Sequence, residues 1–352
     1  MAEFKKLHLS KDNKILSQEI SNPKKLSKKP LVSVCIITYN HVKYISKAID
    51  GALMQITNFD YEILIGEDAS IDGTRNICIE YALKYPDKIR LFLNNRDNVI
   101  YVNNRATGRW NLLNLLKNSK GTYVAICEGD DYWTDPEKLV LQVKYLDSQR
   151  DCSICFHNVL QIYQNNKIIP KPFCYKSQKK ISNLLDLIKR GNFIPTCSVL
   201  FRNNIINEFP DWFNKTVVGD FPLHVLNAEY GDIGYINKIM GVKRSHIGGV
   251  WYSRNDIEKL MGFIEIYQFL NKHFKNKYNH IINEKISDYY YRLAVLYKNN
   301  SKKNPEKLRT RRATIIGMPI SKIFTKLYFV SIVSYVSPKI FINLYKKLVN
   351  RY

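Results

Sequence analysis

Short apolar runs rich in β-branched residues alternate along the first half of the chain with segments whose apolar residues recur every three or four positions. The apolar runs predict four strands, at residues 31–38, 61–68, 89–93 and 122–127. Apolar residues at helical spacing predict a helix in each segment between these strands. The three helices are expected at 44–53, between the Asp-Gly-Thr at 72–74 and Pro86, and at 106–118. This alternation predicts an α/β fold with a mostly parallel sheet, in which ligands bind at the carboxyl ends of the strands.

Polar side chains follow three of the four predicted strands at the point where each strand ends. The segment Thr38–Asn40 closes the first strand, Glu67 and Asp68 close the second, and residues 128–131 close the fourth. Because the carboxyl ends of parallel strands meet at one edge of a sheet, we expect these side chains to share a site.

The third of these clusters places Glu128, Asp130 and Asp131 within four positions of a chain that carries 54 Lys and Arg against 31 Asp and Glu, a formal net charge of +23. Adjacent carboxylates repel one another and usually need a cation or a proton nearby. Oxygen donors without accompanying cysteine suit Mg²⁺ or Mn²⁺, which complete their shells with substrate phosphates. Helix capping is an alternative that explains Asp72 and Asp135 well but explains this cluster poorly.

Three segments, in their order and spacing, carry a resemblance to a known family. They are residues 32–55 with "TYNH", 61–74 with "GEDASIDGT" and 119–139 with "EGDDYW". Over about residues 31–250 the chain resembles the family 2 glycosyltransferases of the bacterial cell-surface glycan type. The resemblance implies a GT-A fold, the Rossmann-like architecture of nucleotide-diphospho-sugar transferases with a mostly parallel central sheet.

The resemblance also implies a nucleotide-sugar-binding set spread over the three strand ends. Its members here are Thr38, Tyr39, Asn40, Glu67, Asp68, Arg105, Glu128, Gly129 and Asp130. In the family the first strand end and the acid pair hold the base and ribose, with Asp68 on the base and Glu67 in support. Arg105 lies where a basic residue could reach the diphosphate, although a solvated surface charge explains it equally well.

The DxD motif of the family, which bridges a divalent metal to the sugar-nucleotide pyrophosphate, falls on Glu128, Gly129 and Asp130. Glu128 stands where the family usually has Asp, so Asp130 is the expected metal ligand, and Glu128 is either a second ligand or a contact to sugar, ribose or water. Several GT-A enzymes have a His after the last core strand, near the metal. His246, two residues after Arg244, is the residue that matches this position. A purely structural histidine is the alternative.

The family's general base lies beyond the DxD motif, at the start of a helix after a "GD" or "ED" pair. The matching segment here is "VVGDFPLH", which assigns the base to Asp220. Such a carboxylate takes the acceptor hydroxyl's proton during inverting transfer. An N-terminal cap is the alternative role, because Pro222 marks a helix start two residues later.

The seven cysteines are odd in number and scattered, and the N-terminal residues have no apolar core of a signal peptide, which favours a reduced cytoplasmic protein. Cys152 and Cys155 form one CxxC within an apolar run, which indicates buried strand thiols rather than a metal site. The net charge favours an anionic partner.

The chain is expected to divide into four parts. Residues 1–30 form a polar N-terminal leader, 31–254 the catalytic domain, 255–300 a helical extension and 301–352 a basic amphipathic segment. The longest uncharged stretch of the last part is too short to span a bilayer, so it either lies in an anionic membrane interface or packs as a helix on the core.

Together these features predict a metal-dependent, inverting glycosyltransferase. It would move a sugar from a nucleoside-diphosphate sugar, expected to be a UDP-sugar, to a lipid-linked or cell-surface glycan, at the inner face of the cell membrane. The alternatives are a nucleotidyltransferase of similar fold, against which "TYNHVKY" lacks a Gly-rich basic loop, and a nucleic-acid-binding protein, against which the basic residues form no recognised module. No nucleic-acid partner is expected, and the absence of GxGxxG after the first strand disfavours a dinucleotide-dependent oxidoreductase.

Overall fold

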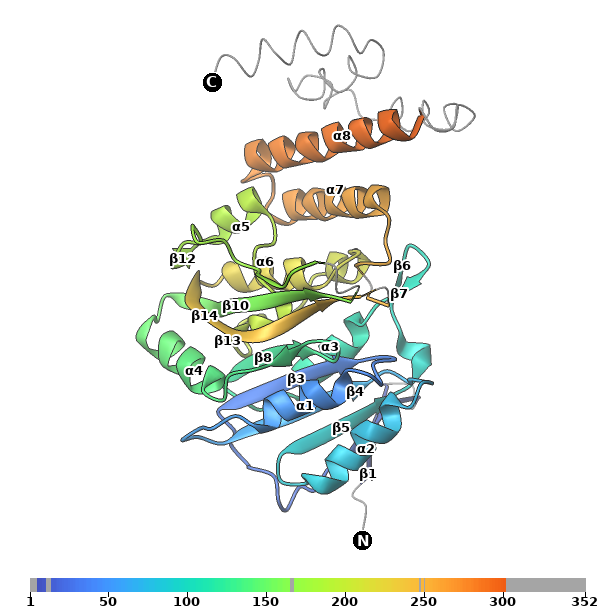
Figure 1. Cartoon of the computed structure of the whole chain (residues 1–352), viewed down its shortest axis with the longest axis vertical. Helices are drawn as coiled ribbons and strands as arrows, with labels where there is room; N and C mark the ends of the chain where they lie inside the picture. The colour runs from blue at the N-terminus through green and yellow to red at the C-terminus, as the bar shows by residue number, and fades with distance from the viewer. Residues whose placement is uncertain (1–4, 11–13, 165–167, 247, 250, 302–352) are drawn as a thin grey trace, which may run out of the picture. The chain divides into compact units, whose positions relative to one another are not determined.

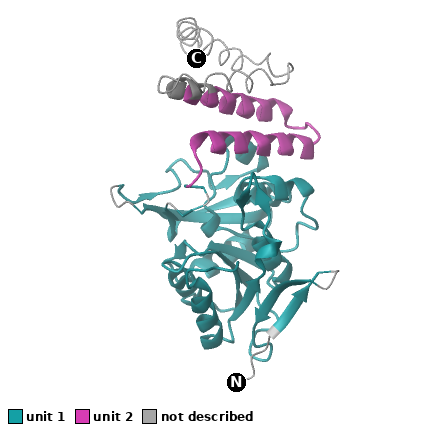
Figure 2. Cartoon of the chain, turned by 90° about the vertical axis from the view of Figure 1, so that its right-hand side faces the viewer, with its two compact units in different colours: residues 1–252 teal, residues 253–352 magenta. Residues whose placement is uncertain are grey.

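The computed structural model of the chain describes residues 5–10, 14–164, 168–246, 248–249 and 251–301. The chain divides into two compact units, residues 1–252 and residues 253–352 (Figure 2). The first unit is an α/β domain built on one large sheet. The described part of the second, residues 253–301, contains two helices, α7 (Asp256–His273) and α8 (Asn279–Ser301).

Twelve strands within the described residues form one sheet, whose main path runs β1-β2-β5-β4-β3-β8-β13-β10-β14-β12 (Figure 1). Its centre is four parallel neighbours, β5 (Ile89–Asn94), β4 (Tyr61–Glu67), β3 (Val32–Thr38) and β8 (Tyr123–Glu128). The remaining strands of this sheet are β1 (Lys5–Leu9), β2 (Ile15–Ile20), β9 (Tyr132–Trp133), β10 (Cys152–Tyr163), β11 (Lys171–Pro172), β12 (Ile181–Ser182), β13 (Leu200–Arg202) and β14 (Asp232–Ser245). The mostly parallel α/β sheet predicted from the sequence is therefore confirmed.

The helices cover both faces of this sheet. The helices of the first unit are α1 (Ile45–Leu53), α2 (Thr74–Lys84), α3 (Arg109–Asn118), α4 (Lys138–Ser148), α5 (Leu184–Arg190) and α6 (Asp220–Ala228). Apolar residues of α1, α2 and α4 share one buried cluster with alternate residues of β3 and β4. Helix α3 contacts the same two strands, where Asn111 Nδ2 donates to Gly66 O at 2.7 Å. A Cβ at Gly66 would lie 1.8 Å from Asn111 Oδ1, so only glycine allows this approach.

The N-terminal residues differ from the expected polar leader, because β1 and β2 extend the sheet beyond β5. The polar composition concealed these strands, since β2 contributes buried polar groups with partners inside the fold. Glu19 is buried and accepts a hydrogen bond from Arg90 Nε of β5 at 2.8 Å, and Ile20 packs into the core. A strand with paired polar side chains has little hydrophobic signal.

The two helices of the second unit fall in the range where a helical extension was expected. Asn255 and Glu258 form a capping box that starts α7, and the Phe263 and Tyr289 rings stack at 5.4 Å between α7 and α8. No helix among the described residues has both the length and the apolar character needed to cross a membrane. The predicted basic segment 301–352 lies outside the described residues, apart from Ser301 at the end of α8.

Candidate active site

The carboxyl ends of β3, β4 and β8 meet at one edge of the sheet, as the sequence predicted. Backbone hydrogen bonds join them, since Asp68 N donates to Thr38 O at 3.1 Å and Gly129 N donates to Ile37 O at 2.9 Å. A Cβ at Gly129 would lie 2.6 Å from Thr38 Oγ1 and 2.8 Å from His41 Nδ1. The ends of β3 and β8 are therefore packed so closely that the position of Gly129 has no room for a side chain.

An aromatic ring, an arginine and a carboxylate form one side of this edge. The Arg96 guanidinium carbon lies 3.9 Å from the centroid of the partly exposed Tyr39 ring, and Arg96 Nη1 donates to Asp68 Oδ2 at 2.8 Å. Burial raises the pKa of Asp68 to about 6, against the opposing charge of Arg96. Sequence analysis missed Arg96. Arg96 follows β5 in a short 3₁₀ turn, η1 (Arg96–Asn98). The expectation that polar residues after parallel strands share one sheet edge, applied to the third predicted strand as well, could therefore have identified it.

Two further predicted residues hold the loop that follows β4. Asn40 has a left-handed backbone, with φ 54°; its N–H donates to Ser70 Oγ at 2.9 Å and its Oδ1 accepts from Ile71 N at 3.0 Å. Glu67 is fully buried and accepts from Ser70 N at 2.6 Å and from Arg75 Nε at 2.5 Å. Both side chains therefore orient the loop on which Asp68 lies.

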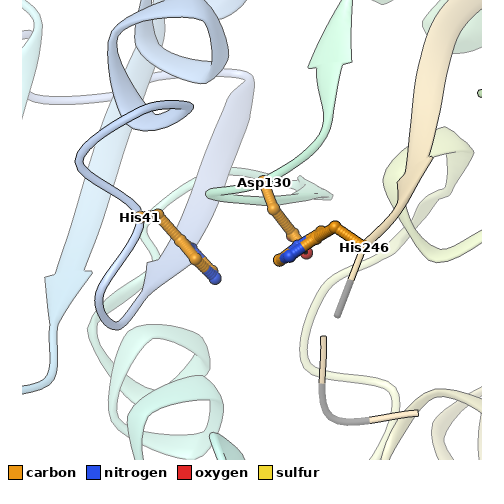
Figure 3. A group of neighbouring side chains, drawn as sticks. All are labelled: His41, Asp130 and His246. Carbon is orange, nitrogen blue, oxygen red and sulfur yellow. Dashed lines mark hydrogen bonds and ion pairs between the residues drawn. The ribbon is translucent and has the colours of Figure 1, made fainter. Parts of the chain in front are cut away.

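Asp130 lies between two histidines from distant parts of the chain (Figure 3). His246 Nε2 is 2.9 Å from Asp130 Oδ2, and one ligand atom from each of His41, Asp130 and His246 lies within 4.8 Å of the others. Burial alone would raise the pKa of Asp130, but the hydrogen bond with His246 and the nearby His41 hold it below its usual value. The predicted pair of Asp130 and His246 is thus brought together, and His41 joins it.

His41 escaped sequence analysis even though it ends the quoted "TYNH" segment. Its Nδ1 lies 3.2 Å from Thr38 Oγ1, and burial is the main reason that its pKa is lowered. The ring centroids of His41 and His246 are 6.3 Å apart. His41 follows β3, and the acidic residues 128–131 close the neighbouring parallel strand β8. This pairing of a histidine with an acidic cluster at one sheet edge is the sequence signal that could have identified His41 as a metal ligand.

Arg244 anchors the end of β14 to the acidic turn. Its N–H donates to Asp131 Oδ1 at 2.7 Å, and its guanidinium donates to Asp130 O. The guanidinium carbon lies 4.3 Å from the Tyr132 ring centroid and 5.0 Å from that of Tyr44. These contacts hold β14 in the position that places His246 against Asp130.

The charges of Glu128, Asp131 and Asp220 all act on one lysine, Lys243 of β14. Burial alone would lower the pKa of Lys243, but these three carboxylates raise it. Burial, followed by the charge of Asp131, raises the pKa of Glu128 well above its usual value. Glu128 is not part of the His41–Asp130–His246 group, and its direct ligation of a metal stays a prediction.

Asp220 is the first residue of α6, preceded by Gly219. Its Oδ2 accepts from Asn192 Nδ2 at 2.9 Å and from Thr196 Oγ1 at 3.4 Å, and its Oδ1 accepts from Phe221 N at 2.7 Å. The carboxylate is therefore held in one orientation by groups from two segments. Its electrostatic contact with Lys243 and Glu128 relates it to the acidic cluster.

Arg105 lies on a separate two-stranded hairpin of β6 (Tyr101–Val102) and β7 (Arg105–Ala106), where it pairs with Val102. Its assignment to a diphosphate stays a prediction. The neighbouring Arg109 has a structural role, because it is buried and donates to Thr216 Oγ1 and Thr216 O, both at 2.8 Å.

The profile of the family described as glycosyl transferase family 2 matches residues 33–208, half of the chain. The chain belongs to this family. This membership favours the glycosyltransferase that the motifs predict over the nucleotidyltransferase and nucleic-acid-binding alternatives.

Relatives in sequence and a solved structure of similar fold accompany this match. An uncharacterized protein of Mycobacterium tuberculosis is 36% identical over 224 residues, 63% of this chain and 61% of the relative. A Bacillus subtilis protein named for teichuronic acid biosynthesis, TuaG, is 32% identical over 129 residues, 36% of this chain and 46% of that protein. The chain spans about three fifths of the length of the first of these. Residues 1–349 of S. aureus TarS, solved with UDP-GlcNAc, share the GT-A-like fold with a TM-score of 0.54 at 17% identity, over 87% of this chain and 80% of that one.

Proposed function

We propose that this glycosyltransferase moves a sugar from a nucleoside-diphosphate sugar to a lipid-linked or cell-surface glycan, with inversion at the transferred carbon. The observation that carries the proposal is that one sheet edge joins the Tyr39–Arg96–Asp68 group to the His41–Asp130–His246 group. An aromatic and polar site beside a carboxylate–histidine site suits the base and the diphosphate of a single donor.

The base of the donor would stack on Tyr39. The Tyr39 ring is 37% exposed while Arg96 lies over it, and the buried Asp68 offers an acceptor beside them. A uracil ring has an N–H donor that such a carboxylate can accept, so a UDP-sugar is the proposed donor. TarS, which shares the fold, was solved with UDP-GlcNAc and supports this choice. Thr38, Asn40, Glu67 and Gly129 would shape the same site.

The donor set of the second group fits a divalent transition ion. Two imidazoles and one carboxylate favour Mn²⁺ over Mg²⁺, which prefers oxygen ligands alone. His41, Asp130 and His246 would hold the ion, and Tyr44, whose ring centroid is 4.9 Å from that of His246, would keep the histidine oriented. Bound there, Mn²⁺ would neutralise charge on the departing nucleoside diphosphate.

Asp220 would act as the general base. Asn192 and Thr196 hold its Oδ2 and the α6 backbone holds Oδ1, so the carboxylate is oriented before an acceptor arrives. It would take the proton of the acceptor hydroxyl as the oxygen attacks the sugar from the face opposite the diphosphate. Gly219 occupies the N-cap position of α6, so Asp220 is not the cap, and its hydrogen bond with Phe221 N in the first turn is compatible with proton removal.

The proposal extends to the acceptor and to the location of the protein in the cell. The relative named for teichuronic acid biosynthesis supports a cell-surface glycan acceptor. The basic segment 301–352 supports peripheral attachment to the inner, anionic face of the cell membrane.

A thermal-shift screen tests the proposal directly. UDP, GDP, ADP and their sugars would be added with Mn²⁺, with Mg²⁺ or with EDTA, because a ligand of the native state raises the melting temperature. We expect the largest shift with a UDP-sugar and Mn²⁺, and release of UDP on addition of acceptor. Stabilisation by no nucleoside diphosphate, or the release of pyrophosphate in place of UDP, would overturn it.

A further inference from the structure

A cavity of about 380 Å³ lies at the end of the sheet opposite the candidate active site. Its walls come from the loop of residues 21–28 after β2 and from the adjoining strand ends, with Arg90 near the start of β5 and Lys120 just before β8. The seven-residue strand β4 separates the two ends by about 20 Å at its usual rise per residue. The cavity is therefore distinct from the Asp130 site.

The floor of the cavity is a buried and ordered guanidinium. Arg90 donates through Nε to Glu19 Oε1 at 2.8 Å and through Nη1 to Glu62 Oε2 at 3.0 Å and Asn118 O at 2.8 Å. Its Nη2 makes no hydrogen bond to a described residue. Three N–H donors of Arg90 are thus held by fixed partners, and Nη2 is the nitrogen of this cavity-lining side chain that has no partner among the described residues.

The two carboxylates around Arg90 each have several partners within the fold. Glu62 Oε1 accepts from Ser33 Oγ at 2.7 Å and from Lys120 N at 2.8 Å, and Glu19 Oε2 lies 3.0 Å from His8 Nε2. Among the described residues that line the cavity, Glu19 is the only carboxylate, and its pKa is lowered by its partners, chiefly Arg90 and also His8, although burial opposes the shift.

The rim carries three exposed lysines, Lys6, Lys28 and Lys120. No ion pair between any of them and a described residue is formed. Together with Arg90 they make four cations against one carboxylate, Glu19, in the part of the cavity wall that the described residues form. Lysines act as point charges and arginine as a planar fork, and this combination suits the several oxygens of a phosphate group.

We propose that this cavity is a second ligand site that binds a phosphate group, separate from the nucleotide-sugar donor. The volume is within the range of small-molecule pockets and exceeds what one phosphate needs, so a phosphorylated sugar or a lipid headgroup fits as well as the free ion. The site does not depend on the proposed donor, metal or base.

The matched variants are two lysine pairs from the same part of the chain. Lys28→Ala/Lys120→Ala removes two charges from the cavity rim, whereas Lys24→Ala/Lys25→Ala removes two exposed charges from the same loop region without touching the cavity. Both leave the Arg90 network in place, so folding is preserved. Asp130→Asn in the full chain serves as a third variant, because it reports any phosphate that binds at the active site.

Inorganic phosphate would be titrated into each full-length variant by calorimetry at constant ionic strength. We expect the rim pair to bind phosphate about 25-fold more weakly than wild type, at about fivefold per lysine, and the control pair and Asp130→Asn to bind as wild type. Equal weakening in both lysine pairs, loss of binding in Asp130→Asn, or no binding by wild type would overturn the proposal.

Co-sedimentation with phosphatidylcholine vesicles, with and without phosphatidylglycerol, distinguishes the sources of the phosphate. If the rim pair alone loses binding to the anionic vesicles, the site takes a headgroup; if vesicle binding is equal in all variants while phosphate affinity differs, it takes a soluble phosphate. Either result supports the site once the titration has shown it.

Discussion

His246 Nε2 lies 2.9 Å from Asp130 Oδ2, although 116 residues separate the two in the chain. Arg244 makes this possible, because its backbone and guanidinium bind the acidic turn from the end of β14. His41 lies next to Gly129 and brings a ring nitrogen within 4.8 Å of the ligand atoms of the pair. A three-residue site therefore depends on contacts among three segments that are far apart in sequence.

The first prediction concerns these three residues. Asp130→Asn should abolish both transfer and the Mn²⁺-dependent part of nucleotide binding, and His41→Gln and His246→Gln should each weaken Mn²⁺ affinity at least about tenfold, since each loses a donor atom. Isothermal titration of Mn²⁺ in the presence of UDP measures this.

His280→Gln is the control for that series, because this exposed histidine of α8 belongs to the second unit. An unchanged Mn²⁺ affinity in His41→Gln would remove His41 from the site and leave Asp130 and His246 as the proposed ligands.

The second prediction concerns proton removal. Asp220→Asn keeps the shape of the side chain and should lower transfer by about 10²- to 10⁴-fold while donor affinity stays within about twofold, because a base acts on the acceptor alone. Steady-state transfer and UDP titration measure the two effects. Asp211→Asn, an exposed acid of the preceding 3₁₀ turn η3 (Asp211–Lys215), is the control. A parallel loss of donor affinity and of melting temperature would instead identify a structural role for Asp220 at the start of α6.

The strands and helices around the site could be predicted because their signal is local. The strand β3 reads "VSVCIIT" and is almost wholly buried, so composition and length identified it, and the shared edge of parallel strands then located Thr38, Asp68 and Asp130. Contacts between residues far apart in the sequence produce no local pattern of this kind. Neither the Glu19–Arg90 ion pair that ties β2 into the sheet nor the approach of His41 to Asp130 follows from spacing along the chain.

The third prediction concerns the segment beyond the described residues. Deleting residues 310–352 should move the protein from the membrane to the soluble fraction and weaken transfer to a lipid-linked acceptor, because it removes the apolar residues Tyr328, Phe329, Ile332 and Val333 and several lysines. Donor hydrolysis should survive. Cell fractionation and parallel transfer and hydrolysis assays measure this.

Charge reversal gives a milder companion to that deletion. Lys346→Glu/Lys347→Glu should raise the fraction released by salt, since only the electrostatic part of attachment is screened. Unfolding or aggregation of the truncated chain would show that the segment packs on the core, and the membrane assignment would be withdrawn.

The last prediction concerns Lys138, the first residue of α4, which is fully buried. Its Nζ has no hydrogen-bond partner among the described residues and lies 3.6 Å from the Trp133 ring centroid. Burial lowers the pKa of Lys138 to about 7, whereas a lysine in the unfolded chain has a pKa of about 10.4. Between these two values the unfolded chain binds the proton and the folded chain does not, so the contribution of Lys138 to the free energy of unfolding falls as the pH drops from about 10.4 to about 7.

Lys138→Met keeps the volume and removes the proton, so it should raise the free energy of unfolding at pH 7 by an amount on the order of 2 kcal/mol, with a gain that shrinks toward pH 10. Urea unfolding at pH 7, 8, 9 and 10 measures the difference from wild type, in which the contribution of the buried thiols cancels. Lys144→Met, an exposed position of the same helix, should change neither the stability nor its pH dependence. A Lys138→Met variant that is less stable than wild type by the same amount at every pH would mean that the ammonium stays charged over the Trp133 ring, and that the cation–π contact outweighs burial.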